Sequence, residues 1–317
     1  MPKTLIMLSP PRSFSSVVST MIGEHPEIYG FPELHLFTDD LLQQAVAREQ
    51  RFKKRPVAGS PGLLRTIAEI HDGVQTSASV IRAIAWLQEH RDWSTKQMMD
   101  YLLEAVAPKI GLEKSPGTAS KAEHLERAYT FYPDAFFLHL TRHPVSSRSS
   151  LTEFSEHIQQ RGNDDLKRVD RLIAWYRWHT NILRFTSTLP LGQTMRVKGE
   201  DVLSDPDLYL PQIAEWLGVA TDSDAIEAMK HPENSPFAKF GPSLAKEGND
   251  PKFLRSPKLR EGRIKEPSLE EFLAKEDIEW FPDGSVRLAA ERAGLRIARD
   301  EKIIEPIAEL AHFLGYT

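Results

Sequence analysis

A short segment near the start of the chain carries the residue types needed to bind an anion. Residues 9–16 read SPPRSFSS and follow the apolar run Leu5–Leu8. Backbone N–H groups at the start of a helix, together with hydroxyls and one guanidinium, form a receptor for a phosphate-like group. We expect this anion loop to be formed by Arg12, Ser13, Phe14, Ser15 and Ser16. Taken alone, the segment also fits a turn that only caps a helix.

A second segment repeats the arrangement of strand, basic loop and helix. An apolar run, Ala135–Leu140, ends at Arg142, and Pro144 suits the first turn of the helix that follows. Ser150 lies eight residues after Arg142, two helical turns further on, so both side chains could flank one oxyanion. A surface ion pair and a solvated serine are the alternative for this segment taken alone.

The elements that must position these residues follow from the hydrophobic pattern. Buried strands are expected at Leu5–Leu8, Ile110–Leu112, Ala135–Leu140 and Thr194–Val197. Helical spacing of apolar residues occurs at Val17–Glu24, Asp39–Glu49, Ser79–His90, Lys96–Ala107, Lys121–Phe131, Val145–His157, Asp170–Thr186, Leu208–Leu217 and Glu305–Phe313. Alternating strands and helices predict an α/β fold with a central parallel sheet between helical layers, and ligands bind such sheets at the carboxyl ends of the strands.

We expect residues 1–317 to form a single domain, because no flexible linker divides the chain. The helix-rich stretch at about 39–107 is too long for one crossover, so it predicts a helical cap inserted over the carboxyl end of the sheet. Residues 232–268 are dense in Pro, Gly, Lys and Arg, which predicts a long ordered loop that covers the ligand. We expect the cap and the residues at 146–170 to form the acceptor pocket.

Composition excludes several classes of chemistry. The chain has 317 residues, 27% of them charged and 40% hydrophobic, and 40 Lys and Arg against 45 Asp and Glu give a net charge of −5. Cysteine is absent, so thiolate nucleophiles, Cys-type zinc sites and iron–sulfur clusters are excluded. The acidic balance argues against sequence-independent nucleic-acid binding, and the lack of a long apolar stretch or signal peptide predicts a cytoplasmic protein without membrane association.

The two loops together resemble those of the sulfotransferases that use 3′-phosphoadenosine 5′-phosphosulfate (PAPS) as donor and release 3′-phosphoadenosine 5′-phosphate (PAP). The matching segments are PPRSFSSVVSTMIGEHPEIYGFPELHLF, FFLHLTRHPVSSRSS, EKSPG, MRVKGEDVLSDP, NDPKFL, GRIKEPSLEEF and the terminal LGYT. The resemblance covers most of the chain and is closest to the tyrosylprotein, carbohydrate and bacterial natural-product branch. It implies a P-loop-like three-layer fold.

The resemblance also implies a role for individual residues. The first loop corresponds to the 5′-phosphosulfate loop, and Arg142 with Ser150 corresponds to the 3′-phosphate site. Lys265 resembles a late contact to the same phosphate, with Arg263 as a second choice. Glu33 stands at the position of the general base, and His35, two residues on, is the alternative base.

Charge on the leaving phosphate needs neutralisation during sulfuryl transfer, as in phosphoryl transfer. Arg12 is the first candidate for this task and Lys114, at the end of another strand, is the second. With these cations present, no metal is required. A solvated surface lysine is the alternative for Lys114.

Two positions depart from the family pattern. Phe14 stands where a glycine is common, and Gly199 stands where a tyrosine is common. These departures put the affinity for the donor in question more than the fold. Either the contact that the family's tyrosine ring makes to the nucleotide is missing in this chain, or another residue supplies it.

The sequence therefore predicts a sulfotransferase that moves a sulfuryl group from PAPS to a hydroxyl of a small-molecule or carrier-bound acceptor, with Glu33 as general base. Two alternatives remain at this point. One is a P-loop small-molecule kinase using ATP, against which stands the absence of the G-x-x-x-x-G-K-S/T pattern. The other is a non-catalytic module that binds PAP. The sequence indicates neither the acceptor nor the oligomeric state.

Overall fold

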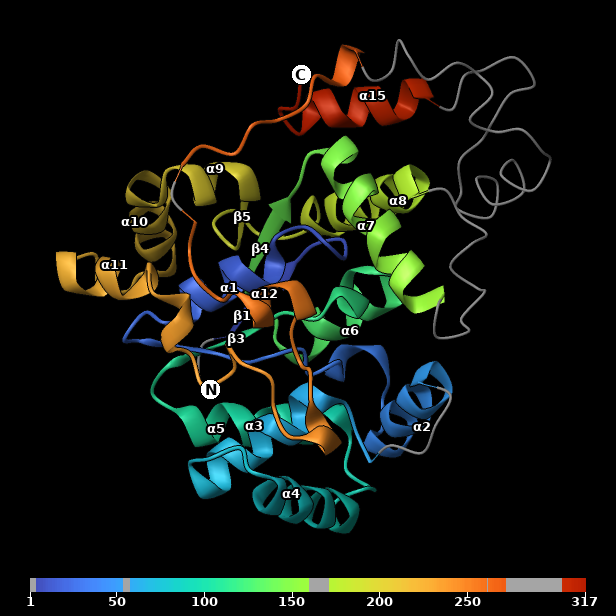
Figure 1. The fold of residues 1–317 in the computed structure, drawn as a ribbon, viewed down its shortest axis with the longest axis vertical. Helices are drawn as coiled ribbons and strands as arrows, with labels where there is room; N and C mark the ends of the chain where they lie inside the picture. The colour runs from blue at the N-terminus through green and yellow to red at the C-terminus, as the bar shows by residue number, and fades with distance from the viewer. Residues whose placement is uncertain (1–3, 54–57, 160–170, 261, 272–303) are drawn as a thin grey trace.

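A five-stranded parallel sheet forms the centre of the molecule in the computed structural model, which describes residues 4–53, 58–159, 171–260, 262–271 and 304–317 (Figure 1). The strand order is β2-β3-β1-β4-β5, and every printed pairing is parallel. The strands are β1 (Thr4–Leu8), β2 (Ile28–Gly30), β3 (Ile110–Glu113), β4 (Phe136–Thr141) and β5 (Thr194–Lys198). The predicted α/β fold with a central parallel sheet is confirmed.

The side chains of β1 alternate between two apolar layers, as a strand with both faces covered requires. Leu5 and Met7 pack in one cluster with residues of α1 and α10, and Ile6 and Leu8 pack in the other with residues of α5 and α6. The helices that build these layers and the rest of the fold are α1 (Ser15–Gly23), α5 (Thr95–Val106), α6 (Ala122–Phe131), α7 (Pro144–Gln159), α8 (Arg171–Thr186), α9 (Gly199–Ser204), α10 (Pro206–Leu217), α11 (Ser223–Met229) and α15 (Ile304–Phe313).

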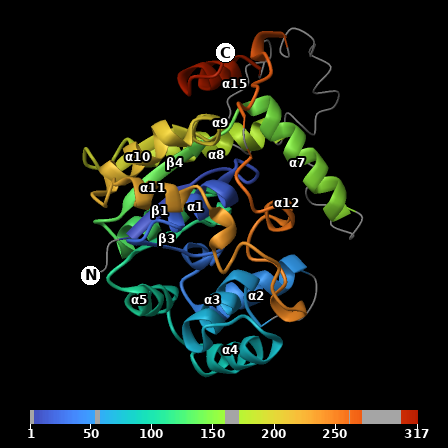
Figure 2. The same ribbon diagram turned by 60° about the vertical axis from the view of Figure 1, so that its left-hand side comes forward.

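The chain between β2 and β3 forms four helices, α2 (Leu42–Lys53), α3 (Pro61–Asp72), α4 (Ser77–Glu89) and α5. Local sequence signals define their ends. Ser60 caps α3, capping boxes start α4 and α5, and Gly73 ends α3 in the left-handed region at φ 66°. Figures 1 and 2 show α2, α3 and α4 gathered below the sheet, and their role as a cap over the ligand stays a prediction.

Several predicted boundaries were wrong. Residues Leu36–Thr38 form a 3₁₀ turn (η1) and α2 starts only at Leu42, so no helix begins at Asp39. The sequence analysis missed β2, α3 and α11. Strand β2 has only three residues, and Pro61-Gly62 is typical of a turn rather than of the first residues of a helix. The start of the predicted helix at Asp170 lies outside the described residues, as do residues 160–170 of the predicted acceptor segment 146–170.

The basic segment 232–268 is ordered around short helical turns, η4 (Pro232–Asn234), η5 (Ser243–Ala245) and α12 (Pro251–Arg255). Phe253 and Leu254 of α12 pack with Ala238, and Val17 of α1 contacts this small cluster. The segment therefore crosses the molecule in front of α1 (Figure 1). In the part of the chain that the structure describes, no helix is long and apolar enough to cross a membrane.

Candidate functional site

Several of the predicted site residues lie at one edge of the sheet. Arg12 follows β1, Lys114 follows β3 and Arg142 follows β4, and the carboxyl ends of parallel strands share an edge. From β1 the chain proceeds to β2 and β3 on one side, whereas β4 and β5 lie on the other. The loops after β1 and β4 therefore flank the topological switch point, where sheets of this kind bind ligands.

The two basic loops are in direct contact. Arg142 donates from Nη1 to the carbonyl oxygen of Arg12 at 2.5 Å and from Nε to Ser146 Oγ at 3.1 Å. Ser150 Oγ accepts from Arg12 Nε at 3.1 Å, so Ser150 pairs with the first loop rather than with Arg142. Arg12, Arg142 and Ser150 thus lie in one cluster, and the binding of a nucleotide to it stays a prediction.

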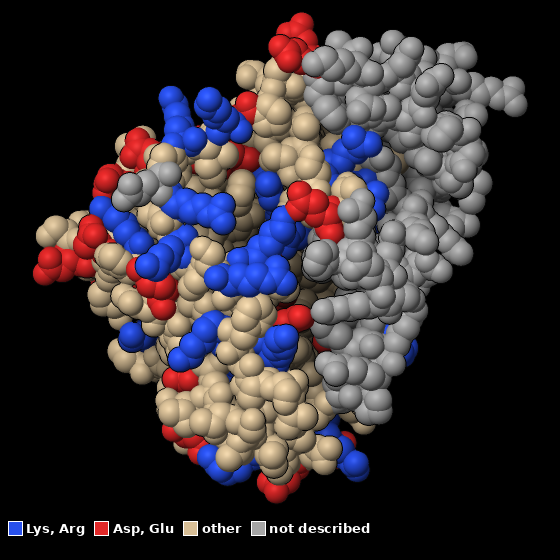
Figure 3. Space-filling view, in the orientation of Figure 1, with Lys and Arg blue, Asp and Glu red and all other residues tan. Residues whose placement is uncertain are grey.

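Both guanidiniums sit close together and away from water. Burial and the neighbouring charge of Arg12 lower the pKa of Arg142 to about 10, against the opposing effect of Glu200. Burial also lowers the pKa of Arg12. Both groups remain cations at neutral pH, and Figure 3 shows Lys and Arg side chains gathered across the middle of this face. The site is suited to a multiply charged anion.

Three non-glycine residues have positive φ angles among the described residues, and all three belong to the predicted site. They are Arg12 at 66°, Phe14 at 61° and His35 at 58°. The left-handed region is costly for residues with a Cβ, and such strain is concentrated at functional sites. The backbone geometry therefore marks the same residues as the sequence did.

The first loop lies beside its predicted helix start. Phe14 is the N-cap of α1 and provides no side-chain hydrogen bond to the helix N–H groups. Ser13, Ser15 and Ser16 are buried, and Ser13 Oγ has no hydrogen-bond partner in the described structure. An uncapped helix start beside an unpartnered hydroxyl fits the binding of an anionic oxygen.

The carboxylate of Asp250 lies against the Arg12 guanidinium, where an anionic ligand of Arg12 would lie. The sequence analysis did not select this residue. Its Oδ2 pairs with Arg12 Nη1, and its backbone N–H donates to Ser16 Oγ at 3.1 Å. Oδ1 accepts from the N–H of Lys252 at 2.7 Å and so caps α12. The chain's own carboxylate thus shows that Arg12 accepts an anion. The only sequence signal was the Asn249-Asp250-Pro251 turn.

Glu33 and Lys114 form an ion pair at the same edge. Lys114 is 1% exposed, and its Nζ lies 2.7 Å from Glu33 Oε1, 3.0 Å from Ser16 Oγ and 3.3 Å from Asn249 Oδ1. This burial excludes the solvated surface lysine that the sequence left open.

His35 lies on the other side of the Glu33 carboxylate, with its Nε2 3.7 Å from Glu33 Oε2. Burial alone would raise the pKa of Glu33, but Lys114 and His35 outweigh it and lower the pKa to about 2. Glu33 is therefore ionised at neutral pH, and Lys114 holds it in that form.

The backbone of Glu33 is fixed by two glycines. A Cβ at Gly62, in the first turn of α3, would lie 2.2 Å from the carbonyl oxygen of Glu33. On the other side, the N–H of Glu33 donates to the carbonyl oxygen of Gly248 at 2.7 Å. The cap and the basic segment therefore hold Glu33 by close backbone contact.

Behind His35 lies a buried pair that the sequence analysis did not select. Ser115 Oγ accepts from the N–H of His35 at 2.9 Å and donates to Glu113 Oε1. Glu113 is fully buried, and burial raises its pKa. Both residues flank Lys114 in the EKSPG segment at the end of an apolar strand. Polar residues in that place were the signal in the sequence that could have identified this pair.

Arg263 and Lys265 are not joined to this cluster. Both are exposed on the extended segment 262–268, which is attached to α9 through Ile264 N and Ser204 Oγ at 2.9 Å. Among the described residues, neither side chain bonds to Arg12 or Arg142. Their predicted contact with a 3′-phosphate stays a prediction.

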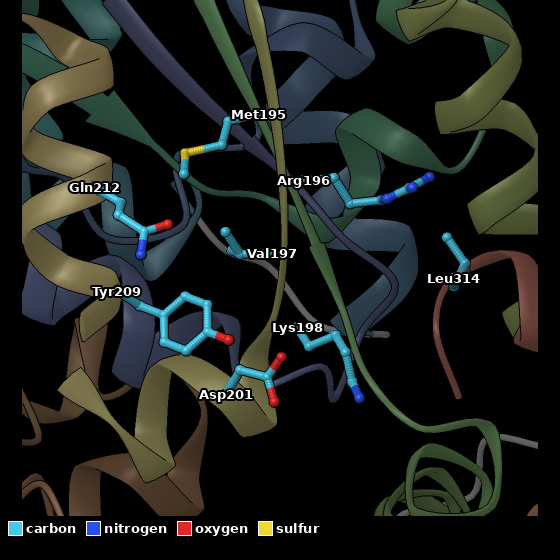
Figure 4. Close-up of a pocket in the computed structure, with 8 residues that line it drawn as sticks. All are labelled: Met195, Arg196, Val197, Lys198, Asp201, Tyr209, Gln212 and Leu314. Carbon is cyan, nitrogen blue, oxygen red and sulfur yellow. The ribbon is translucent and has the colours of Figure 1, made fainter. Parts of the chain in front are cut away.

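A hollow of about 250 Å³ lies elsewhere, on the outer flank of the edge strand β5 (Figure 4). Its lining comes from β5, α9, α10 and the C-terminal end: Met195, Arg196, Val197, Lys198, Asp201, Tyr209, Gln212 and Leu314. None of these is a predicted site residue. Over the described ranges, no cluster of three metal-ligating side chains occurs.

Comparisons with known proteins agree with this geometry. The chain is similar in structure to a sulfotransferase domain from the curacin biosynthetic pathway, with a TM-score of 0.72, 21% identity and coverage of 100% of this chain and 99% of that one. It is also similar to the sulfotransferase domain of the Synechococcus PCC 7002 olefin synthase, with a TM-score of 0.68, 22% identity and coverage of 100% and 95%. A search of curated protein sequences found no match. Residues 4–223 match the family model described as "Sulfotransferase family", and the chain therefore belongs to the sulfotransferase family.

Proposed function

We propose that this protein transfers a sulfuryl group from PAPS to a hydroxyl of a small-molecule or carrier-bound acceptor. The observation that carries the proposal is the contact between the Arg12 and Arg142 loops across the switch point. Membership of the sulfotransferase family supplies the reaction class. Two adjoining cationic loops match a donor that carries anionic groups at both ends of one nucleotide.

The residues present fit such a donor. The sulfonate and 5′-phosphate would lie against Arg12 and the N-terminus of α1, where Asp250 now supplies a carboxylate. The unpartnered Ser13 Oγ is available for the same oxygens. The 3′-phosphate would lie against Arg142. Because the carboxylate of Asp250 occupies Arg12, the donor must displace it.

Transfer forms a bond between the acceptor oxygen and sulfur while the bond from sulfur to the 5′-phosphate oxygen breaks and PAP leaves. The acceptor proton goes to Glu33. A carboxylate with a pKa of about 2 is a weak base. Lys114 must therefore shift from Glu33 toward the leaving phosphate, which raises the pKa of Glu33 and neutralises the departing charge in one movement.

The class of acceptor rests on the named structural relatives, which come from the curacin pathway and an olefin synthase. Both names point to enzymes of natural-product and hydrocarbon assembly, so we favour an alcohol on a small molecule or on a carrier. Helix α3 adjoins Glu33 through Gly62, which supports a position of the cap beside the acceptor.

Isothermal titration with PAP tests the donor site. Arg12→Ala and Arg142→Ala should each weaken binding roughly tenfold to a hundredfold, since each removes charged hydrogen bonds to a phosphate. Arg91→Ala is the matched control, because that side chain is 72% exposed and pairs with its neighbour Asp92. Wild-type affinity in both site variants would reject the proposal.

Turnover of PAPS with a panel of hydroxylated acceptors tests the base. Glu33→Gln should lower kcat by a factor on the order of 10² to 10⁴ while PAP affinity stays within a few fold. His35→Asn should have the smaller effect, and the reverse order would assign the base to His35. Tight PAP binding without sulfation of any acceptor would favour a non-catalytic module, and magnesium-dependent ATP turnover would favour a kinase.

A further inference from the structure

The ring of Phe14 lies at the junction of the two basic loops. The guanidinium carbon of Arg142 is 4.0 Å from the centre of the ring, which is cation–π geometry. The ring also covers Gly199, where an added Cβ would lie 2.9 Å from Phe14 Cδ2 and 3.3 Å from Phe14 Cβ. Phe14 therefore contacts both the second basic loop and the start of α9.

The backbone at residue 14 favours glycine, because its φ is 61°. A phenylalanine at this position bears a conformational cost that its ring contacts must offset. The φ of Gly199 is not positive, so space rather than backbone conformation makes a glycine necessary there. The large residue and the small one are thus complementary, and neither can be changed alone without affecting the other.

Arg142 uses only part of its donor set within the protein. Its Nε donates to Ser146 and its Nη1 donates to Arg12, and the described residues supply no partner for Nη2. The Phe14 ring packs against the guanidinium of Arg142. The ring and the two hydrogen bonds together hold the remaining donors, and no carboxylate of the described residues forms a hydrogen bond with them.

We propose that Phe14 is a positioning residue that holds Arg142 ready for the 3′-phosphate of the donor, with Gly199 providing the space for the ring. This inference rests on the proposed function, because it assigns Arg142 to that phosphate. It also accounts for the two departures from the family pattern together. The aromatic side chain comes from the first loop instead of from position 199.

The test compares two nucleotides that differ only in the 3′-phosphate, PAP and 5′-AMP, by isothermal titration. Phe14→Leu keeps an apolar side chain and the left-handed backbone but removes the π face. PAP affinity should fall roughly three- to tenfold, the size of a partly buried cation–π contact. Affinity for 5′-AMP should stay within about twofold of wild type by the same reasoning.

The matched control is Phe136→Leu, which removes a ring on β4 that packs against Trp216 of α10. It should leave the ratio of the two affinities unchanged. If Phe14→Leu weakens the binding of PAP and of 5′-AMP by the same factor, the ring is merely structural and the inference is overturned. An unchanged affinity for both nucleotides would overturn it as well. A wild-type protein that binds neither nucleotide would overturn the proposed function as well.

A second pair of variants avoids dependence on one substitution. Gly199→Ala should push the ring away from Arg142 and lower the preference for PAP over 5′-AMP. In a Phe14→Ala background the same change should have little further effect, because the clash is gone. Independent effects of the two substitutions would contradict the pairing of Phe14 with Gly199. Circular dichroism and thermal unfolding confirm that each variant is folded before titration.

Discussion

The loop after β1 and the loop after β4 both lead from a buried strand through an arginine into a helix, but different interactions hold them. The first loop has two left-handed residues, Arg12 and Phe14, and is held by contacts to distant loops such as that of Arg12 to Asp250. The second loop is held by buried side chains.

Four hydrogen bonds fix the second loop. Trp175 Nε1 donates to the carbonyl oxygen of Arg142 at 2.8 Å, and Glu200 Oε1 accepts from the N–H of His143 at 2.9 Å. Tyr316 bonds to Glu200 Oε2 at 3.3 Å and to Thr141 Oγ1 at 2.7 Å. These bonds tie the second loop to buried side chains, although His143 Nε2 and Ser147 Oγ have no hydrogen-bond partner among the described residues. We therefore expect the second loop to be the more rigid of the two, and the first to adjust to its ligand.

Glu200→Ala should break the second loop most severely. Glu200 is 2% exposed, and its loss leaves the N–H of His143 without its side-chain acceptor and removes one of the two partners of the Tyr316 hydroxyl. We expect about 3 kcal/mol less stability toward unfolding by urea. PAP binding should weaken with it. Undiminished stability would mean that the network does not hold the loop.

A fall in pH should destabilise the second loop before it affects the first. Burial lowers the pKa of His143 from 6.5 to about 4, so the unfolded chain binds a proton below about pH 6.5 and the folded chain does not. Stability therefore falls as the pH drops from 6.5 to 4. Between pH 7 and pH 5, the free energy of unfolding of His143→Gln should fall by about 2 kcal/mol less than that of the wild type. Urea unfolding at both pH values measures this difference.

The ion pair of Glu33 with Lys114, whose Nζ also donates to Ser16 after the first loop, responds at lower pH. The pKa of Glu33 is lowered from 4.5 to about 2, so its contribution is complete above pH 4.5 and disappears as the pH falls toward 2. Hydrogen exchange at pH 5 should therefore show lost protection in the second loop with the Glu33 region intact. Loss in both regions at the same pH would contradict the comparison.

Tyr316→Phe should have a smaller effect, since only the hydroxyl is removed and the buried ring remains. Thr141 Oγ1 and Glu200 Oε2 each lose a partner. We expect a loss of about 1 kcal/mol in urea unfolding. Because the last residues of the chain carry this contact, a much larger loss would show that the C-terminal segment does more than support the second loop.

Asp250→Asn should scarcely change stability, because asparagine caps α12 as well as aspartate does. It removes the carboxylate that competes for Arg12, so PAP should bind about two- to fivefold more tightly. Isothermal titration measures this change. Weaker binding would show that Asp250 assists the donor instead of being displaced by it.

Much of this arrangement was readable from the sequence because it depends on local order. Apolar runs predicted four of the strands, and the positions of Arg12, Lys114 and Arg142 at strand ends followed from the parallel sheet. The short β2 could not be predicted, because three residues carry no detectable period.

Contacts between distant segments could not be predicted. The pairing of Arg12 with Asp250 joins residues 238 positions apart, and the fit of Phe14 to Gly199 depends on side-chain packing between two strand ends. The left-handed angle at Phe14 had a signal only in the resemblance, where a glycine is common at this position, since phenylalanine itself does not favour that angle. Such features arise only when the fold brings the segments together.

Glu33 owes its location to main-chain atoms, since Gly62 and Gly248 meet it without side chains between them. With Glu33 as the proposed proton acceptor, we therefore expect amino-acid changes elsewhere on α2–α4 to alter the proposed acceptor pocket while Glu33 stays where it is. An engineer seeking altered acceptor selectivity should vary the exposed cap residues freely and leave these two glycines untouched.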